Sequence, residues 1–308
     1  MLTRTCTPHF VVAGMPRAGT TFLYHNLQRH PAVHLPWRKE LNYLNLHRDR
    51  GPRWYADQLG AARSGQRVGD VEPGYFLDPE VPDRLRESAP GVRVVLVLRE
   101  PVSWIASVHA HLARQSEPVP PLRDFVLRGW DRRQDGGILR YRFAPRVLEA
   151  LVERWRRTFG PELLVVDYAW FAADRLGALQ ALESFLELPP YFAPGRFDDR
   201  RINASRGRAL PFVGKLARSG AIDRLAGVPG LRAAVRRARP LVDHVMAAPS
   251  GAGGSAAPVP PEVVALLAPA TRRHRDIFAP GPLVRGDGAS LAPLAPSRSG
   301  SPEPIAAP

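Results

Sequence analysis

The chain of 308 residues carries a formal net charge of +14, and 44% of its residues are hydrophobic. This length is enough for one large domain with a substantial core. No run of about 18 apolar residues indicates a membrane span, and the first residues, MLTRTCTPHF, lack the apolar segment of a secretory signal. The single cysteine, Cys6, excludes an internal disulfide and suits a reducing compartment, so we expect a cytoplasmic protein.

The positive charge is carried almost entirely by arginine, because Lys39 and Lys215 are the only lysines among 43 basic residues. Such a bias is typical of a GC-rich bacterial genome, so the ratio by itself indicates no function. The net positive sign favours an anionic cofactor or substrate. The sequence has no zinc-finger spacing and no aromatic-rich RNA-binding signature, so we expect no nucleic-acid partner.

Alternating apolar runs and amphipathic stretches predict the elements of an α/β fold. The expected strands are 10–13, 33–35, 68–71, 92–98 and 162–168, and the expected helices are 20–30, 54–62, 101–114, 143–160 and 176–186. The run 92–98 is almost continuously apolar, which is typical of a central parallel strand that is covered on both faces. Strands that alternate with helices predict a single three-layer domain with a central parallel sheet flanked by helices.

Towards the C-terminus the pattern weakens. Residues 212–261 indicate a basic helical insertion followed by a low-complexity linker, and 262–278 indicate a last helix that is interrupted at Pro269. The stretch 286–308 is rich in Pro, Ala and Ser and is expected to be a disordered tail. The sequence therefore predicts one domain over 8–285.

The segment GMPRAGTT, from Gly14 to Thr21, joins the first expected strand to the first expected helix. Glycines let the backbone approach an oxyanion, and the N–H groups of the loop and of the helix N-terminus point at it. The glycine spacing is that of the nucleotide-binding P-loop, G-x-x-x-x-G-K-[ST], but Thr20 stands where that loop has its lysine. The nearest cation in the loop is Arg17. The segment predicts a P-loop-type domain with a phosphate site that is poorly suited to Mg–ATP.

Three segments, in the same order, resemble the cofactor motifs of the sulfotransferases that use PAPS (3′-phosphoadenosine 5′-phosphosulfate). GMPRAGTTFL resembles their 5′-phosphosulfate loop, VVLVLREPVSWIASVHAH their 3′-phosphate segment, and NASRGRALP their C-terminal cofactor segment. The resemblance implies these cofactor-binding residues: Arg17, Ala18, Gly19, Thr20, Thr21, Arg99, Ser107, Arg206, Gly207 and Arg208. Two further segments, RKELNYLNLHRDRGPRWYADQL and GDVEPGYFLDPEVPDRL, resemble the acceptor side of the heparan-sulfate type, so the chain resembles a bacterial member of that group.

The position of Arg99 agrees with a phosphate-binding role. Arg99 follows the buried strand, so its guanidinium is expected at the carboxyl edge of the sheet, where α/β folds bind ligands. Ser107 lies in the next helix, with Ser103 one turn before it on the same side. An arginine fork with a hydroxyl suits a phosphate monoester. A surface ion pair of Arg99 with Glu100 or Asp70 is the alternative.

Sulfuryl transfer to a hydroxyl needs a base, an in-line geometry, and neutralisation of the charge that develops on the leaving phosphate. The resemblance implies that Glu40 is the general base. Arg17 is the candidate on the leaving-group side, since a guanidinium stabilises negative charge but gives up no proton near neutral pH. A solvated Glu40 that pairs with Lys39 or Arg38 is the alternative.

Four polar side chains are candidates for contacts with the acceptor: Lys39, Asp70, Glu72 and His109. The glycan enzymes of the family have a lysine where Val71 stands here, so Asp70 or Glu72 is a candidate to orient a different acceptor. His109 and His111 lie two residues apart on a helix and face different ways, so we expect no metal site.

The sequence therefore predicts a sulfotransferase that moves the sulfuryl group of PAPS to a hydroxyl of a carbohydrate, lipid or small molecule without a metal. A P-loop kinase or NTPase that uses Mg–ATP is the first alternative, against which the missing lysine counts. A basic binding module without catalytic activity is the second alternative.

Overall fold

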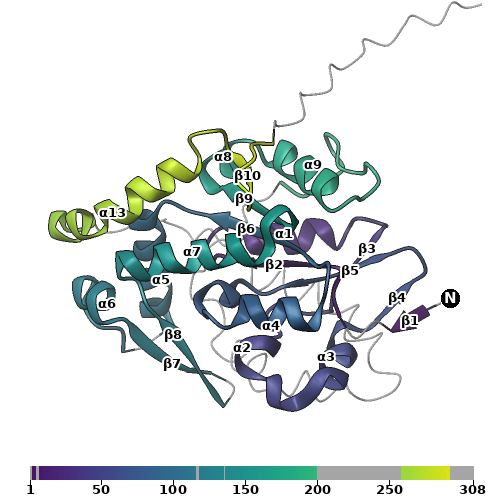
Figure 1. Ribbon diagram of the computed structural model, residues 1–308, viewed down its shortest axis with the longest axis horizontal. Helices are drawn as coiled ribbons and strands as arrows, with labels where there is room; N and C mark the ends of the chain where they lie inside the picture. The colour runs from purple at the N-terminus through teal and green to yellow at the C-terminus, as the bar shows by residue number, and fades with distance from the viewer. Residues whose placement is uncertain (1, 5–6, 116–117, 135, 200–257, 292–308) are drawn as a thin grey trace, which may run out of the picture.

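The computed structural model describes residues 2–4, 7–115, 118–134, 136–199 and 258–291 (Figure 1). The predicted cofactor segment with Arg206, Gly207 and Arg208 lies outside these residues, as does most of the predicted insertion and linker.

Six strands form the central sheet in the order β10-β9-β6-β2-β5-β3. Their bounds are β2 (Phe10–Gly14), β3 (Val33–His34), β5 (Arg67–Val71), β6 (Arg93–Leu98), β9 (Leu163–Asp167) and β10 (Leu283–Arg285). The first five run parallel, while β10 pairs antiparallel with β9 at one edge. The predicted parallel sheet is confirmed, and the antiparallel edge strand is an addition to it.

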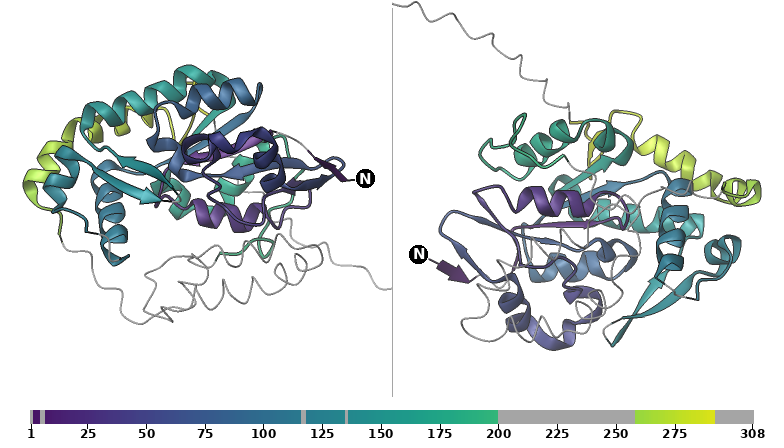
Figure 2. Two further views of the ribbon diagram at one scale, coloured as in Figure 1. Left: turned by 90° about the horizontal axis from the view of Figure 1, so that it is seen from below. Right: turned by 180° about the vertical axis from the view of Figure 1, so that it is seen from behind.

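Helices cover both faces of the sheet, which gives the predicted three layers. The longer helices are α1 (Thr20–Leu27), α3 (Gly51–Leu59), α4 (Val81–Ser88), α5 (Pro101–Arg114), α7 (Pro145–Phe159), α9 (Arg175–Phe185) and α13 (Pro261–Ile277). The short ones are α2 (Tyr43–Leu46), α6 (Leu122–Arg128), α8 (Tyr168–Ala173), η1 (Arg48–Arg50), η2 (Pro73–Leu77) and η3 (Gly160–Glu162). Helices α4 and α7 lie in front of the sheet in Figure 1, and α1 lies behind it, as the reverse view in Figure 2 shows.

The central strands are buried because their side chains are apolar on both faces. Val94 to Leu98 are at most 2% exposed, and Leu163 to Val166 are fully buried. Cross-strand pairs such as Val12 with Val95 and Val12 with Val71 align the ends of β2, β6 and β5. The loops that follow these three strands therefore open at one common edge of the sheet.

Two short antiparallel pairs stand apart from the central sheet. One is the hairpin of β7 (Trp130–Gln134) and β8 (Gly137–Tyr141), which projects from the body of the molecule (Figure 1). The other joins β1 (Leu2–Arg4) to β4 (Ala61–Arg63).

The last helix differs from the prediction, because α13 continues through Pro269. A proline inside a helix removes one backbone hydrogen bond. The buried side chains Leu267 and Ala270, on a helix that contacts both α5 and α7, favour continuity at this point. Ordered chain also extends past the predicted domain boundary at 285, since the Gly286 N–H donates to the Leu163 carbonyl.

Candidate active site

The loop between β2 and α1 is held in place by β6 and α5. The Met15 N–H donates to the Val97 carbonyl at 3.0 Å, and the Trp104 indole N–H donates to the Pro16 carbonyl at 2.7 Å. Ala18 is fully buried and Thr20 starts α1, while Thr21 in the same first turn is half-buried. The loop therefore presents the N-terminus of α1 at the carboxyl edge of the sheet.

Gly19 is required by the shape of this loop. Its φ is +82°, in the left-handed region that glycine adopts without strain. A Cβ at this position would come within 2.2 Å of a ring carbon of Phe171 in α8. The close approach explains why the second glycine of the motif stands here.

Arg17 also has a left-handed backbone, with φ +63°. A non-glycine residue in this region is uncommon and often marks a functional loop. Its carbonyl accepts a hydrogen bond from Arg99 at 3.3 Å. Burial and, after it, the positive charge of Arg17 lower the pKa of the His111 ring on α5 to about 4.

Arg99 emerges where β6 ends, as the sequence predicts. Its Nε donates to Ser103 Oγ at 3.2 Å, and its guanidinium lies 4.9 Å from the centre of the Tyr168 ring. Ser107 is half-buried one turn further along α5 on the same helix face. The structure thus brings Arg99 and Ser103 beside the phosphate loop, with Ser107 one turn further along the same face of α5.

The alternative ion pairs of Arg99 do not form within the described part of the chain. Glu100 caps α5 instead, where its carboxylate accepts the N–H groups of Val102 and Ser103 at 3.0 and 2.8 Å. Asp70 accepts the Tyr55 hydroxyl at 2.7 Å.

The segment that carries Glu40 is fixed to the end of β5. The Glu40 N–H donates to the Val71 carbonyl at 3.1 Å, and the Asn42 side chain donates to the Glu40 carbonyl at 3.1 Å. The Asn42 N–H donates to the Glu72 carboxylate at 2.8 Å. Glu40 itself has φ +67°, so these contacts hold a non-glycine residue in an unfavourable backbone region. Backbone strain of this kind is typical of residues in functional sites.

Lys39 connects Glu40 to the phosphate loop. Its Nζ lies 2.8 Å from Glu40 Oε1 and donates to Thr21 Oγ1 at 2.9 Å. The Lys39 side chain is 18% exposed and the Glu40 side chain 46% exposed, so the carboxylate opens towards solvent while the ammonium is enclosed. The alternative pairing of Glu40 with Lys39 is thus observed, but the pair lies beside the loop and not on a remote surface.

The surroundings of Glu40 favour its ionised form. Burial acts to raise the pKa of Glu40, but the charge of Lys39, its hydrogen bond, and the weaker influence of His111 and Arg132 hold the pKa below its usual value. Burial and the charge of Arg17 lower the pKa of His111 to about 4. At neutral pH the candidate base is therefore a carboxylate beside a neutral imidazole.

Asp70 and Glu72 lie beneath this surface rather than on it, since they are 0% and 1% exposed. Burial raises the pKa of Asp70 to about 6, and burial with the nearby charge of Glu40 raises the pKa of Glu72 well above its usual range. Glu72 accepts the N–H groups of Asn42 and Gly74, at 2.8 and 3.0 Å. The Glu72 carboxylate therefore supports the segment that carries Glu40, while Asp70 pairs with the Tyr55 hydroxyl of α3.

His109 and His111 face different ways, as predicted, but it is His111 that faces Glu40. His109 pairs with the Pro120 carbonyl at 2.8 Å and packs on Phe125 of α6. His111 contacts the Gln115 amide at 2.9 Å, and Arg132 of β7 donates to the same amide at 2.8 Å. Sequence reasoning missed His111, although it follows Ser103 and Ser107 at intervals of four residues and so shares their helix face.

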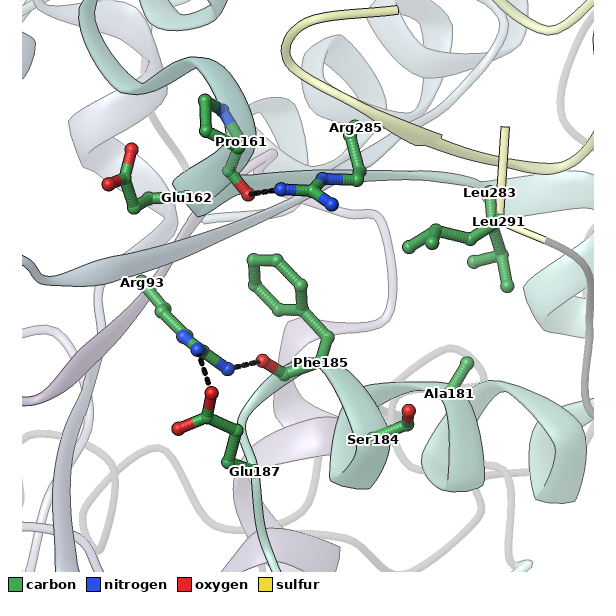
Figure 3. A pocket seen from close by; sticks show the side chains of 10 residues that line it. All are labelled: Arg93, Pro161, Glu162, Ala181, Ser184, Phe185, Glu187, Leu283, Arg285 and Leu291. Atoms are coloured by element: carbon green, nitrogen blue, oxygen red, sulfur yellow. Dashed lines mark hydrogen bonds and ion pairs between the residues drawn. The ribbon is translucent and has the colours of Figure 1, made fainter. Parts of the chain in front are cut away.

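A cavity of about 430 Å³ lies at the opposite end of the strands (Figure 3). Its walls include Arg93 at the start of β6, Glu162 before β9, and Phe185 at the end of α9. None of the predicted site residues lines it. The candidate site is accordingly assigned to the carboxyl edge, where the loop, Glu40 and Arg99 meet.

A survey of the described ranges finds no helix with the length and apolar character that crossing a membrane requires. The same residues contain no cluster of three or more His, Cys, Asp or Glu side chains arranged to hold a metal ion.

No protein-family model matches the chain, but parts of it are similar to curated sulfotransferases. The membrane-associated sulfotransferase kil1 of Dictyostelium discoideum is 34% identical over 100 residues, which cover 32% of this chain and 21% of that protein. Heparan sulfate glucosamine 3-O-sulfotransferase 5 of Homo sapiens is 25% identical over 205 residues, which cover 65% of this chain and 58% of that protein. The chain thus matches less than two thirds of the length of these curated relatives.

The fold has a counterpart among solved structures. The crystal structure of a sulfotransferase from Alicyclobacillus acidocaldarius aligns with a TM-score of 0.50 and 18% sequence identity, over 73% of this chain and 98% of that one. This likeness supports the P-loop-type architecture that the sheet and the loop indicate. The curated proteins that the chain resembles are sulfotransferases, and this solved structure shares its fold.

Proposed function

We propose that this protein transfers a sulfuryl group from PAPS to a hydroxyl group of a carbohydrate, lipid or small-molecule acceptor. The observation that carries the proposal is the contact chain from Glu40 through Lys39 to Thr21, with bonds of 2.8 and 2.9 Å. It joins a candidate base to a loop of phosphate-binding shape. The names of the glycan-modifying relatives favour a carbohydrate among these acceptors.

The residues present fit a cofactor with two anionic groups. The loop residues Arg17 to Thr21 would hold the 5′-phosphosulfate with backbone N–H groups and the Thr20 and Thr21 hydroxyls. Arg99, with Ser107, would hold the 3′-phosphate, because the Arg99 guanidinium is already placed by Ser103 and Tyr168 at the same edge. When bound, PAPS supplies an activated sulfuryl group on a phosphate leaving group.

Glu40 would take the proton of the acceptor hydroxyl. The Glu40 side chain is 46% exposed, so an acceptor can approach it from solvent, and its lowered pKa keeps it ionised at neutral pH. General base catalysis of this kind contributes typically about 10²–10⁴ in rate. Arg17 would stabilise the negative charge on the departing phosphate, since a guanidinium keeps its charge at every physiological pH.

A kinase or NTPase is the second candidate, and the observations disfavour it. The loop has Thr20 in place of the lysine, and the relatives found are sulfotransferases.

The proposal includes a cytoplasmic location, because the chain has a single cysteine and a reducing compartment suits it. Fractionation of the producing cells tests this location.

The experiment that tests the function combines binding with turnover. We expect calorimetry to show binding of PAP, the desulfated product, and no binding of ATP with Mg²⁺. Transfer from radiolabelled PAPS is then measured over a panel of sugar, lipid and phenolic acceptors. Binding of Mg–ATP without binding of PAP would refute the proposal.

A further inference from the structure

We propose that Lys39 is the positioning residue of this site: its ammonium bridges the Glu40 carboxylate to the Thr21 hydroxyl and so aims the base at the group that the phosphate loop holds. The inference rests on the proposed function, because it needs Glu40 to act as the base. It assigns to Lys39 a task inside the enzyme, in place of the acceptor contact that the sequence suggests.

The geometry of the bridge carries the inference. Glu40 is anchored through its backbone to the end of β5, and Thr21 belongs to the first turn of α1. Lys39 Nζ reaches both side chains, at 2.8 and 2.9 Å. Two separate elements at the sheet edge are thereby joined through one enclosed ammonium group.

The other charged and titratable groups near Glu40 do not duplicate the bridge. Glu72 is buried beneath the segment that carries Glu40, while the charges of His111 on α5 and Arg132 on β7 help to lower the pKa of Glu40. The charge of Arg17, together with burial, lowers the pKa of His111 and so keeps this imidazole neutral at neutral pH. Lys39 Nζ lies 2.8 Å from the Glu40 carboxylate and also reaches Thr21, so it joins the two elements directly.

The residue type supports the same conclusion. This chain uses arginine at almost every basic position, and Lys39 is one of two exceptions. An ammonium is a compact charge with three donors, which suits two contacts in different directions better than a planar fork does. The two recorded contacts use two of these donors.

The position of Lys39 between Glu40 and the phosphate loop also suits the movement of negative charge during the reaction. The acceptor proton moves to Glu40 as the acceptor oxygen bonds to sulfur, and the bond from sulfur to the leaving phosphate breaks with its electron pair on the phosphate. Glu40 is then neutral, and Lys39 stays protonated. The ammonium thus loses its anionic partner at the moment when negative charge appears on the phosphate at the loop.

The test is the pH profile of kcat/KM for Lys39→Met, compared with the unchanged protein. The acid limb of this profile reports the base of the free enzyme. Loss of an adjacent opposite charge raises a carboxyl pKa by about 1–3 units, so the limb should move up by about that much. The ratio of kcat/KM at low pH to that at pH 8 should fall at least about tenfold. A merely structural loss would lower both values equally.

Three further variants sharpen the test. Lys39→Arg should restore the acid limb, because it keeps the charge. Thr21→Val should lower kcat, and in the double variant it should move the acid limb no further than Lys39→Met does, since either change breaks the same bridge. Arg128→Met removes a cation from an 82% exposed side chain on α6 and should leave the profile unchanged.

The outcomes separate this inference from the proposed function. If the unchanged protein binds PAP and transfers sulfate, and Glu40→Gln does not transfer, the function stands. An unshifted acid limb in Lys39→Met would then overturn the bridge alone. If the unchanged protein neither binds PAP nor transfers, the function itself fails.

Discussion

At the scale of single residues, two substitutions of Glu40 distinguish the role of its carboxylate from the strain in its backbone. A left-handed φ of +67° costs a non-glycine residue about 1 kcal/mol or more. Glu40→Gly and Glu40→Ala both remove the carboxylate, but only glycine relieves the backbone. We expect both variants to lose transfer by at least about 10², with Glu40→Gly more stable than Glu40→Ala by about 1 kcal/mol. Urea unfolding and a labelled-PAPS assay measure the two effects, and equal stabilities would contradict the strain.

Asp70 gives a second residue-scale prediction, which concerns pH and stability. Burial raises its pKa to about 6 in the folded protein, against about 3.9 in the unfolded chain. A raised folded pKa means that its stabilising contribution is fully present below pH 4 and is lost as the pH rises through 6. The difference amounts to about 3 kcal/mol.

Asp70→Asn removes that titration and keeps an oxygen that can accept the Tyr55 hydroxyl. The free energy of unfolding of the variant, relative to the unchanged protein, should therefore increase by about 2 kcal/mol between pH 4 and pH 7. Denaturant titrations at both pH values measure this difference. A pH-independent difference would show that Asp70 does not titrate in this range.

At the scale of elements, Gly19 and Gly91 form a matched pair for the shape of the phosphate loop. Both have positive φ, +82° and +77°, but a Cβ on Gly19 meets the Phe171 ring at 2.2 Å, whereas a Cβ on Gly91 meets nothing within 4 Å. Gly91→Ala should cost about 1–2 kcal/mol for the backbone alone. Gly19→Ala should cost about 1–3 kcal/mol more, from overpacking. The difference in unfolding free energy tests the contact between the loop and α8.

The elements predicted from sequence are those whose pattern is local. The strand at 92–98 and the helix at 101–114 were predicted at or within one residue of their observed bounds, since a continuous apolar run and a proline in the first turn identify them. The hairpin of β7 and β8 was missed, because WDRRQ is a charged segment whose strand character depends on pairing with β8. The helix α4 was missed as well.

The site residues also fall into those that local sequence predicts and those that depend on contacts in space. Arg99, Glu40 and the loop glycines are identified by motif order in the sequence. The bridge from Lys39 to Thr21 joins residues 18 positions apart, and the packing of α5 decides whether His109 or His111 faces Glu40. Contacts of this kind depend on how β5, α1 and α5 are placed in space, which no spacing along the chain encodes.

At the scale of the whole molecule, the parallel sheet gathers the site from distant parts of the chain. The ends of β2, β5 and β6 carry the phosphate loop, the support for Glu40, and Arg99. A ligand that contacts all three should stabilise the fold as one unit. At a PAP concentration of 100 times its dissociation constant, the stabilisation is about 2.7 kcal/mol.

Arg99→Ala tests this coupling between ligand and fold. The variant loses the guanidinium that would hold the 3′-phosphate. Hydrogen bonds to a charged group contribute about 1.5–3 kcal/mol, so the affinity for PAP should fall at least about tenfold. Thermal unfolding should then show that, at a PAP concentration of 100 times the original dissociation constant, the PAP-induced stabilisation falls from about 2.7 kcal/mol to about 1.4 kcal/mol or less in the variant. Glu40→Gln is the matched control, because it should retain the full shift while losing transfer. If PAP stabilises Arg99→Ala as strongly as the unchanged protein, Arg99 does not hold the cofactor, and the phosphate site must lie elsewhere along this edge.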